Sequence, residues 1–295
     1  MRREHNRQAI YKDAVVPEAT AIRYSSSMMH KKESGVGHRA KKSLGQNFLM
    51  HARIAERIAD AAKLPAGSTV LEIGPGTGML TRPLLQRAGR VIAIEADHEL
   101  VARLQETFAA ELAQKKLVLI YADIRSFDPS AIEEPYALVA NIPYYITGEI
   151  IRTFLSASHK PSSMTLLVQK EVAERAARSQ KESLLSLSIK VFGTPQYEFT
   201  VPRGAFLPAP NVDSAVLSIR DIKDPFGKKS AETRFFEVLH AGFAHKRKLL
   251  LRNLEAVATL HRVRTAFQDA GIPEKARAED LKLPAWQKLA QMLSE

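Results

Sequence analysis

A short polar and aromatic segment, Asn141-Ile142-Pro143-Tyr144, carries the residues with the clearest chemical potential in this sequence. It follows the apolar run 137–140, which predicts a buried strand. The side-chain oxygen of Asn141 can accept a hydrogen bond from an exocyclic amine. Pro143 fixes the turn and leaves its carbonyl free, and Tyr144 can stack on a flat ring. The pattern predicts a site for a hydrogen-bonding heterocycle, and a simple strand-ending turn is the alternative.

A glycine-rich loop lies upstream of this segment. Gly74, Gly76 and Gly78 follow the apolar run 70–73 and precede an amphipathic stretch at 79–85. Strand, glycine loop and helix in this order form the nucleotide-binding turn of an open α/β sheet. The spacing G-x-G-x-G differs from the G-x-G-x-x-G of pyrophosphate sites, and no Walker lysine follows. A nucleoside without phosphates fits better, and S-adenosylmethionine is the predicted ligand.

Two carboxylates follow the next two predicted strands. Glu95 ends the strand at 90–94, and Asp123 lies just beyond the strand at 117–121. A carboxylate at the first position can accept both hydroxyls of a ribose. Asp123 is placed to accept from an adenine amine. Each of them alone is more often a solvated strand end, but the ordered set predicts an adenosine pocket.

Further motifs extend this ordered set along the chain. The complete set is Gly45-Gln46-Asn47-Phe48-Leu49, Glu72-Ile73-Gly74-Pro75-Gly76-Thr77-Gly78, Glu95, Asp123, Asn141-Ile142-Pro143-Tyr144, Gln169-Lys170-Glu171-Val172-Ala173 and Phe206-Leu207-Pro208-Ala209-Pro210-Asn211-Val212-Asp213-Ser214. From about Lys41 to the C-terminus the chain resembles the KsgA-type ribosomal RNA adenine dimethyltransferases. The resemblance implies an α/β fold, with a Rossmann-like S-adenosylmethionine-dependent methyltransferase sheet and a small all-helical C-terminal domain.

The resemblance also implies roles for individual residues. With the glycine loop, it predicts a cofactor pocket formed by Asn47, Leu49, Gly74, Gly76, Glu95, Asp123 and Asn141. The target amine is expected to donate to the Asn141 side chain and to the carbonyl of Ile142 or Pro143. Tyr144 is expected to stack on one face of the base. Phe206 is the candidate for the other face, with a core phenylalanine as the alternative. Transfer is expected to be direct, without a covalent enzyme intermediate.

The implied substrate is a pair of neighbouring adenines in a hairpin loop of small-subunit (16S) ribosomal RNA within a pre-ribosomal particle. Each adenine would be methylated twice at N6, a number that no spacing in the chain reveals. One alternative is the related large-subunit adenine N6-methyltransferase of the macrolide-resistance type. Another is a non-catalytic RNA-binding assembly or transcription factor on the same fold. The C-terminal segments 243–248 and 277–279 resemble the small-subunit enzymes, and the intact Asn141 favours an active enzyme.

The net charge of +11 is concentrated at the two ends of the chain. Residues 1–42 carry +6, from 10 basic and 4 acidic side chains, and residues 222–295 carry +5, from 14 and 9. Residues 43–221, with 19 of each, are neutral. An excess of basic side chains suits a polyanion such as RNA. A basic cluster at Lys246, Arg247, Lys248 and Arg252 is predicted to present one cationic helix face to RNA, and a solvated face is the alternative.

Composition excludes several classes of protein. The chain has no cysteine, so disulfides and thiolate metal sites are impossible, and its nine histidines form no ligand-spaced cluster. No metal is therefore expected. No apolar run approaches the roughly 18 residues of a membrane span. A cytoplasmic monomer is the simplest expectation.

Three regions are expected along the chain. Residues 1–40 form a basic, disordered arm, in which Met28 offers an internal start. Residues 41–221 form the methyltransferase domain, and residues 222–295 form a helical domain that recognises RNA or the ribosome. The segment 178–188 contains no glycine, whereas family members often carry a glycine-containing linker and a Tyr-Gly pair there. Its shape and its RNA contacts are therefore left open.

Periodicity predicts the elements that position these residues. Strand and helix patterns alternate to about residue 192, which gives a parallel sheet with helices on both faces. Helices are expected at 52–63, 97–113 and 147–157, and one further strand is expected at 164–168. Strands at 197–201 and 215–219 are expected to pair antiparallel at one edge. Apolar helical stripes then follow over 235–243, 249–257 and 281–293, with Trp286 expected in the core.

Overall fold

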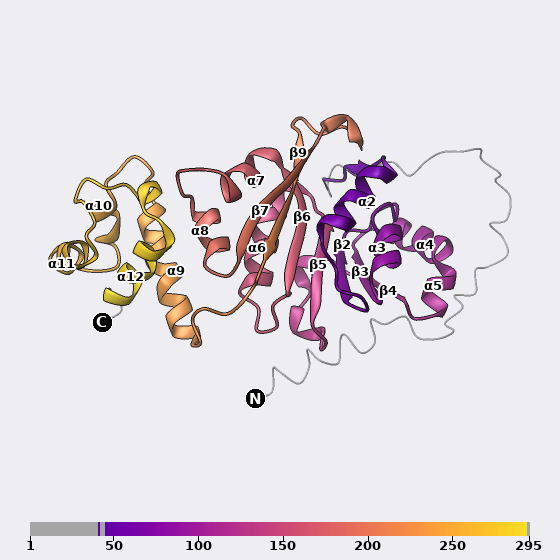
Figure 1. The fold of residues 1–295 in the computed structure, drawn as a ribbon, viewed down its shortest axis with the longest axis horizontal. Helices are drawn as coiled ribbons and strands as arrows, with labels where there is room; N and C mark the ends of the chain where they lie inside the picture. Colours follow the sequence, from indigo (N-terminus) through magenta and orange to yellow (C-terminus); the bar gives the residue numbers. More distant parts are fainter. Residues whose placement is uncertain (1–40, 42–44, 294–295) are drawn as a thin grey trace.

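The computed structural model describes Lys41 and residues 45–293. The predicted arm at 1–40, with the start at Met28, lies outside these residues. The described chain forms a twisted sheet with helices on both faces, followed by a separate group of helices at the C-terminal end (Figure 1). The α/β class with a helical C-terminal part agrees with the prediction.

Within the described residues, the main sheet has seven strands in the order β4-β3-β2-β5-β6-β9-β7. The strands are β2 (Thr69–Ile73), β3 (Arg90–Glu95), β4 (Leu117–Tyr121), β5 (Tyr136–Asn141), β6 (Ser163–Gln169), β7 (Thr194–Val201) and β9 (Ser214–Arg220). The five strands from β4 to β6 pair in parallel. β9 pairs antiparallel with both β6 and β7, which confirms the predicted antiparallel pair at one edge.

The central strands are apolar because both of their faces are covered. All five residues of β2 are buried, as expected for a strand inside a parallel sheet. Leu71 and Ile73 face the core that includes Ile150, whereas Val70 faces the opposite core with Ile58. Alternation along the strand therefore supplies side chains to two hydrophobic layers.

The helices that build these layers come from the connections between strands. They are α2 (Ala52–Ala61), α3 (Thr81–Arg87), α4 (His98–Thr107), α5 (Ala109–Ala113), α6 (Thr147–Leu155), α7 (Lys170–Ala177) and α8 (Leu184–Lys190). The single helix predicted at 97–113 is divided at Phe108, whose backbone leaves the helical conformation. Its buried ring packs beside Gly78.

A two-stranded sheet ties the start of the described chain to its later part. β1 (Phe48–Leu49) pairs antiparallel with β8 (Phe206–Leu207). The sequence pattern did not predict this pairing, because two-residue strands have no detectable periodicity. The pair holds the segment 45–49 close to the carboxyl ends of the central strands.

The topology creates one natural crevice. β3 follows β2 on one side of it, whereas the later strand β5 lies on its other side. Ligands of open α/β sheets bind outside the carboxyl ends of the strands at such a switch point. The predicted glycine loop and the Asn141 segment follow β2 and β5 respectively, so both lie at this crevice.

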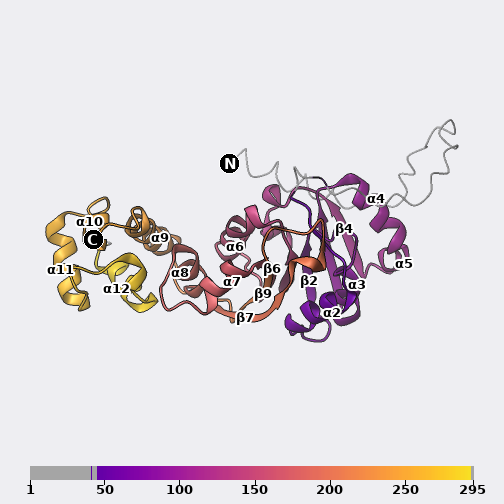
Figure 2. The ribbon, with the colours of Figure 1, turned by 90° about the horizontal axis from the view of Figure 1, so that it is seen from above.

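The C-terminal part consists of α9 (Lys229–Phe243), α10 (Leu250–Leu254), α11 (Leu260–Ala270) and α12 (Leu283–Met292). These helices lie beyond α8, at the end of the molecule opposite β4 (Figures 1 and 2). Trp286 is fully buried, as predicted. α11 was not predicted, because its short apolar stripe lies between the recognised stripes at 249–257 and 281–293.

The basic cluster has a different local structure from the prediction. Lys246, Arg247 and Lys248 lie in a turn between α9 and α10, and only Arg252 is helical. The prediction of one continuous helix face is therefore wrong. The amide of buried Asn253 donates to the carbonyls of Gly242 (2.7 Å) and His245 (3.1 Å). These bonds satisfy carbonyl groups at the end of α9 and fix the turn. We refer to Lys246, Arg247, Lys248 and Arg252 as the basic turn.

Candidate active site

A pocket opens at the carboxyl ends of β2 to β5. It brings together most of the residues predicted from the sequence. These are Asn47, Leu49, Gly74, Gly76, Glu95, Asp123, Asn141, Pro143 and Tyr144. They come from four strand ends and from the segment that contains β1, so residues far apart in the sequence line one cavity.

The glycine loop provides close access to the backbone. Gly74 and Gly76 adopt positive φ values of 66° and 59°. A Cβ added to Gly74 would meet only the Asn141 carbonyl oxygen, at 3.8 Å, so it would fill open pocket space. Gly78 has another role, because a Cβ there would lie 2.5 Å from the ring of Phe108. Gly74 therefore forms a cradle for a ligand, whereas Gly76, where an added Cβ would lie 3.2 Å from the Phe48 ring, and Gly78 allow close packing.

Glu95 is buried at the end of β3, and the backbone holds its carboxylate. Its oxygens accept from the N–H groups of Gly76 (3.0 Å) and Asp97 (2.9 Å). Burial raises the pKa of Glu95, and these backbone hydrogen bonds oppose the shift. A carboxylate has about four acceptor positions, so it can bind the glycine loop and still accept from two hydroxyl groups of a ligand.

Asp123 lies in the pocket wall but already binds a cation. The Arg125 guanidinium lies 2.6 Å from its Oδ2 atom, and this hydrogen bond holds the pKa of Asp123 below its usual value. The pair was not predicted from the sequence, because nothing in the pattern at 123–125 shows that Arg125 turns back onto Asp123. An amine donor must share the carboxylate with Arg125 or displace it.

The side chain of Asn141 is oriented by the segment opposite it. Its Nδ2 atom donates to the carbonyl oxygen of Asn47 at 3.3 Å. A carbonyl can only accept, so the amide must present nitrogen to Asn47. The Oδ1 atom then remains available as an acceptor. The arrangement presents an oriented amide oxygen at the end of β5, which is the chemistry predicted for Asn141.

Tyr144 is held by a residue whose role was not predicted. Its hydroxyl lies 2.6 Å from the Oγ atom of Ser214, which is fully buried at the start of β9. Burial raises the pKa of Tyr144, so the phenol stays neutral. Ser214 ends the last motif of the sequence set, and that position was the available signal. The hydrogen bond fixes the plane of the ring in the pocket wall.

Tyr145 is a second aromatic residue that sequence reasoning missed. It lines the pocket and is 64% exposed. Its ring packs on Gly45, where an added Cβ would lie 2.9 Å from the ring. The signal was the tyrosine that directly follows the Asn-Ile-Pro-Tyr segment. Tyr145 thus presents an aromatic surface at the pocket mouth.

Phe206 does not line the pocket. Its side chain is only 4% exposed and belongs to the hydrophobic core beneath the β1–β8 pair. The structure therefore places it as the core phenylalanine that the sequence left open as the alternative. A role in base stacking would require the ring to leave this core. The neighbouring Leu207 is 61% exposed.

The segment that covers the pocket is anchored by a buried carboxylate. Asp97 accepts from Lys41 Nζ (2.8 Å) and from Gln46 Nε2 (3.1 Å). The hydrogen bond from Lys41 opposes burial and holds the pKa of Asp97 low. Asp97 was not singled out in the sequence. Its contacts keep residues 45–49 in place over the glycine loop.

Glu72, the first residue of the glycine motif, is 1% exposed. Burial raises the pKa of its carboxyl to about 8, repulsion from Glu95 acts in the same direction, and the Thr81 hydroxyl opposes both. Its pKa is thus raised above the ordinary value of 4.5. The folded state holds this proton more tightly than the unfolded state, so the stability that Glu72 contributes falls as pH rises from about 4.5 to about 8.

We expect Glu72→Gln to remove this pH dependence. Relative to the unaltered protein, the unfolding free energy of the variant should rise by up to about 1.4 kcal/mol per pH unit within that window. Urea titrations at pH 5, 6, 7 and 8 measure it. Glu106→Gln, an exposed change of the same kind, is the control. Stability curves that run parallel for Glu72→Gln and the unaltered protein would contradict the assignment.

The basic turn lies in the helical C-terminal part, which Figure 2 shows at the end of the molecule opposite β4, whereas the pocket is lined by residues at the carboxyl ends of β2 to β5. Lys246, Arg247 and Lys248 are exposed. Arg252 forms an ion pair with Glu255 at 2.7 Å. Three cations of the turn therefore face solvent directly, whereas the fourth is partly neutralised.

Among the residues that the structure describes, no group of three or more His, Asp or Glu side chains could hold a metal ion. No helix in the described part is both long and apolar enough to cross a bilayer. The pocket at the switch point is the candidate active site, because it brings the oriented Asn141 amide together with Gly74, Glu95 and Asp123.

The strand order, the cradle at Gly74 and the carboxylates at the following strand ends define the Rossmann-like fold of S-adenosylmethionine-dependent methyltransferases. A family model described as ribosomal RNA adenine dimethylase matches residues 37–295. The chain belongs to this family, which confirms the resemblance found in the sequence.

Curated relatives are similar over most of the chain. A ribosomal RNA small subunit methyltransferase A from Dehalococcoides mccartyi is 41% identical over 272 residues, which cover 90% of this chain and 92% of the relative. The protein of the same name from Listeria welshimeri is 36% identical over 271 residues, with 86% and 91% covered.

Solved structures show the same architecture. The 23S rRNA methyltransferase ErmE matches with a TM-score of 0.69 and 29% identity, over 84% of this chain and all of that chain. A dimethyladenosine transferase from Plasmodium falciparum matches with a TM-score of 0.68 and 25% identity, over 82% and 95%. The two scores are nearly equal, so the fold alone does not separate these two kinds of enzyme.

Proposed function

We propose that this protein transfers methyl groups from S-adenosylmethionine to the N6 atoms of two adjacent adenines in a hairpin loop of small-subunit (16S) ribosomal RNA. The product is N6,N6-dimethyladenine, made during assembly of the small subunit. The observation that carries the proposal is the oriented Asn141 amide in a pocket that also contains a cradle and carboxylates for an adenosine. Identities of 36–41% to proteins named for the small subunit support this choice of substrate.

The pocket residues fit the cofactor. Gly74 leaves room for a ligand against the backbone, and the Gly76 N–H holds the Glu95 carboxylate. Glu95 offers acceptor positions to ribose hydroxyls, and Asp123 offers one to an adenine amine. Asn47 and Leu49 lie in the segment that covers them. S-adenosylmethionine supplies, when bound, an activated methyl group on a sulfonium ion.

The protein contributes mainly position and hydrogen bonding. The exocyclic nitrogen of adenine is a poor nucleophile because its lone pair is delocalised into the ring. Accepting its hydrogens with Asn141 Oδ1 and with the carbonyl of Ile142 or Pro143 favours a more nucleophilic nitrogen. Tyr144, held by Ser214, presents its ring to one face of the base. Positioning of this kind can supply several kcal/mol without a strong base.

A base must leave its stack to reach such a pocket. The basic turn is proposed to hold the surrounding RNA, because residues 43–221 are electrically neutral. The protein is proposed to act as a monomer. The proposed substrate places the protein in the cytoplasm, where ribosomal particles assemble.

We expect Glu95→Ala to weaken S-adenosylmethionine binding while RNA affinity changes little. Loss of a charge-assisted hydrogen bond costs about 1.5–3 kcal/mol, which is roughly tenfold to a hundredfold in affinity. Titration calorimetry measures the effect. Glu106→Ala, an exposed change on α4, serves as a comparison. Unchanged cofactor affinity in Glu95→Ala would place the ribose elsewhere.

The alternative with a specific observation behind it is a large-subunit enzyme, because ErmE matches the whole of its own chain on this structure. A parallel assay separates the two. Methyl transfer from labelled S-adenosylmethionine is measured on unmethylated small subunits, large subunits and naked RNA. If the proposed function is right, labelled methyl groups appear in the RNA of small subunits. Label confined to large-subunit RNA would favour the alternative, and no transfer to any of the three would favour a non-catalytic RNA-binding protein.

A further inference from the structure

A buried carboxylate lies where the helical part meets the rest of the molecule. Glu182 precedes α8, and its side chain is 3% exposed. Lys190 Nζ, at the end of α8, lies 2.8 Å from both carboxylate oxygens. Ser186 Oγ donates to Oε2 at 2.9 Å. The Glu182 charge is therefore already paired with Lys190 of α8, independently of any contact with the helical part.

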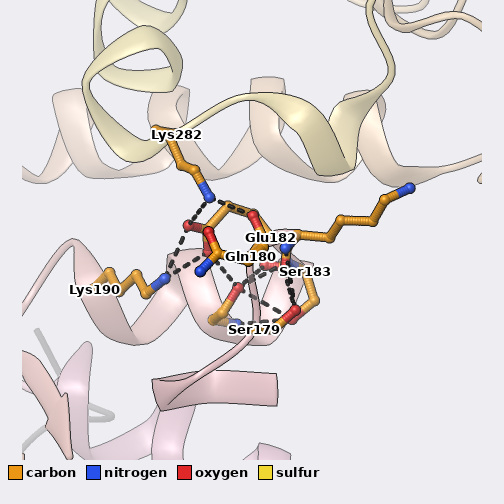
Figure 3. Close-up of polar contacts among 8 residues, drawn as sticks. Ser179, Gln180, Glu182, Ser183, Lys190 and Lys282 are labelled. Carbon is orange, nitrogen blue, oxygen red and sulfur yellow. Dashed lines mark hydrogen bonds and ion pairs between the residues drawn. The ribbon is translucent and has the colours of Figure 1, made fainter. Parts of the chain in front are cut away.

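The C-terminal part reaches the same carboxylate. Lys282, directly before α12, places its Nζ 3.5 Å from Glu182 Oε1 and also donates to the carbonyl of Gln180. Figure 3 shows Glu182 between Lys190 on one side and Lys282 on the other. Burial pushes the pKa of Glu182 up, but the hydrogen bonds from Lys190 and Ser186 outweigh it, so the group is ionised.

The backbone contributes to the same junction. The Glu182 N–H donates to the carbonyl of Glu279 at 2.8 Å. Lys181 forms an ion pair with the Glu279 side chain. The segment before α8 is thus joined to the segment before α12 by main-chain and side-chain contacts. This is the glycine-free segment 178–188, whose shape the sequence left open.

Another contact between the two parts lies at a different place and is largely apolar, although the Lys223 N–H there also donates to the Phe192 carbonyl at 3.0 Å. Phe192, just after α8, stacks on Phe236 of α9 with 6.1 Å between ring centroids, and Phe226 packs against both rings. An apolar contact is not directional and allows small rotations. A second attachment with defined hydrogen-bond geometry would restrict such rotations.

We propose that Glu182 is a positioning residue that fixes the helical part on the catalytic part, so that a ribosomal particle can meet the pocket and the basic turn together. The inference rests on the proposed function, because only a large substrate spans both sites. Glu182 touches neither cofactor nor base. Loss of its contacts should therefore affect recognition of the particle more than the chemical step.

Two variants test the proposal. Glu182→Gln removes the buried charge. Lys282→Ala removes a side chain that is 55% exposed, so this second variant does not endanger folding. Glu171→Gln on α7, which removes a surface ion pair with Arg175, is the matched control. The chain has no cysteine of its own. Cysteines introduced at the exposed positions Thr153 and Lys275 therefore carry the only two spin labels. Their distance distribution reports the relative orientation of the two parts.

Both variants should broaden this distribution and raise KM for small subunits by about tenfold, which equals about 1.4 kcal/mol. Neither kcat at saturating particles nor cofactor affinity should change, and the control should match the unaltered protein. An unchanged distribution would overturn the proposal, and so would a broadened one with unchanged KM. If the unaltered protein methylates no particle, the proposed function fails, and the distance distribution alone still decides whether Glu182 fixes the two parts.

Discussion

Replacing Asn141 by alanine is expected to abolish most methyl transfer while cofactor and RNA binding stay substantial. The Asn141 amide is oriented by the Asn47 carbonyl, so its oxygen is positioned before the substrate arrives. Removal of one preorganised hydrogen-bonding group of an active site typically costs about a hundredfold to a thousandfold in rate. The single-turnover rate of methyl transfer to small subunits should fall by that factor.

The control for this prediction is Asn211→Ala, the same change in an exposed loop. Calorimetry with S-adenosylmethionine and binding to small subunits should show that the Asn141→Ala protein still binds both partners. Turnover at the unaltered rate would remove Asn141 from the mechanism. A large loss of binding with an unchanged rate at saturation would make it a binding residue instead.

The second large effect is expected at the basic turn. Replacing Lys246, Arg247, Lys248 and Arg252 by glutamine should weaken binding to ribosomal particles and flatten its dependence on salt. Each phosphate contact contributes roughly 0.7–0.9 to the slope of log affinity against log salt. Because Arg252 is paired with Glu255, most of the change should come from the three exposed cations. A decrease of about two to three in the slope is expected.

The matched control replaces four cations far from the turn, Lys63, Arg90, Arg103 and Lys115. Arg90 pairs with Glu134 as Arg252 pairs with Glu255. Binding is measured across a salt series with small subunits, and cofactor affinity is measured separately and should not change. An unaltered slope in the variant of the turn, or an equal loss in the control, would leave a solvated surface as the better account.

The parts of the site that the sequence predicted are short contiguous motifs at strand ends. Asn141, Gly74 and Glu95 follow strongly apolar strands, and parallel strands bring their carboxyl ends to one edge. Local pattern and topology then suffice to place these residues together. The antiparallel edge was predictable for a similar reason, since little sequence that could form a helix separates residues 197–201 from 215–219.

The features that escaped prediction depend on contacts between distant residues. The β1–β8 pair, the burial of Phe206 beneath it and the bond between Tyr144 and Ser214 join segments more than 60 residues apart. Local helix propensity predicts a helix at the basic turn. In the structure, Asn253 of α10 instead binds a carbonyl group at the end of α9 and holds the turn. Glu182 gave no signal, because its partner Lys282 lies 100 residues away.

We propose above all that the product is dimethyladenine in small-subunit RNA. Mass spectrometry of nuclease fragments from unmethylated small subunits, incubated with the protein and S-adenosylmethionine, tests this proposal most directly. One 16S fragment should gain four methyl groups, two on each of two adjacent adenines, and no fragment should gain any with Asn141→Ala. Methylation of other nucleotides, or of large-subunit RNA alone, would contradict the proposal.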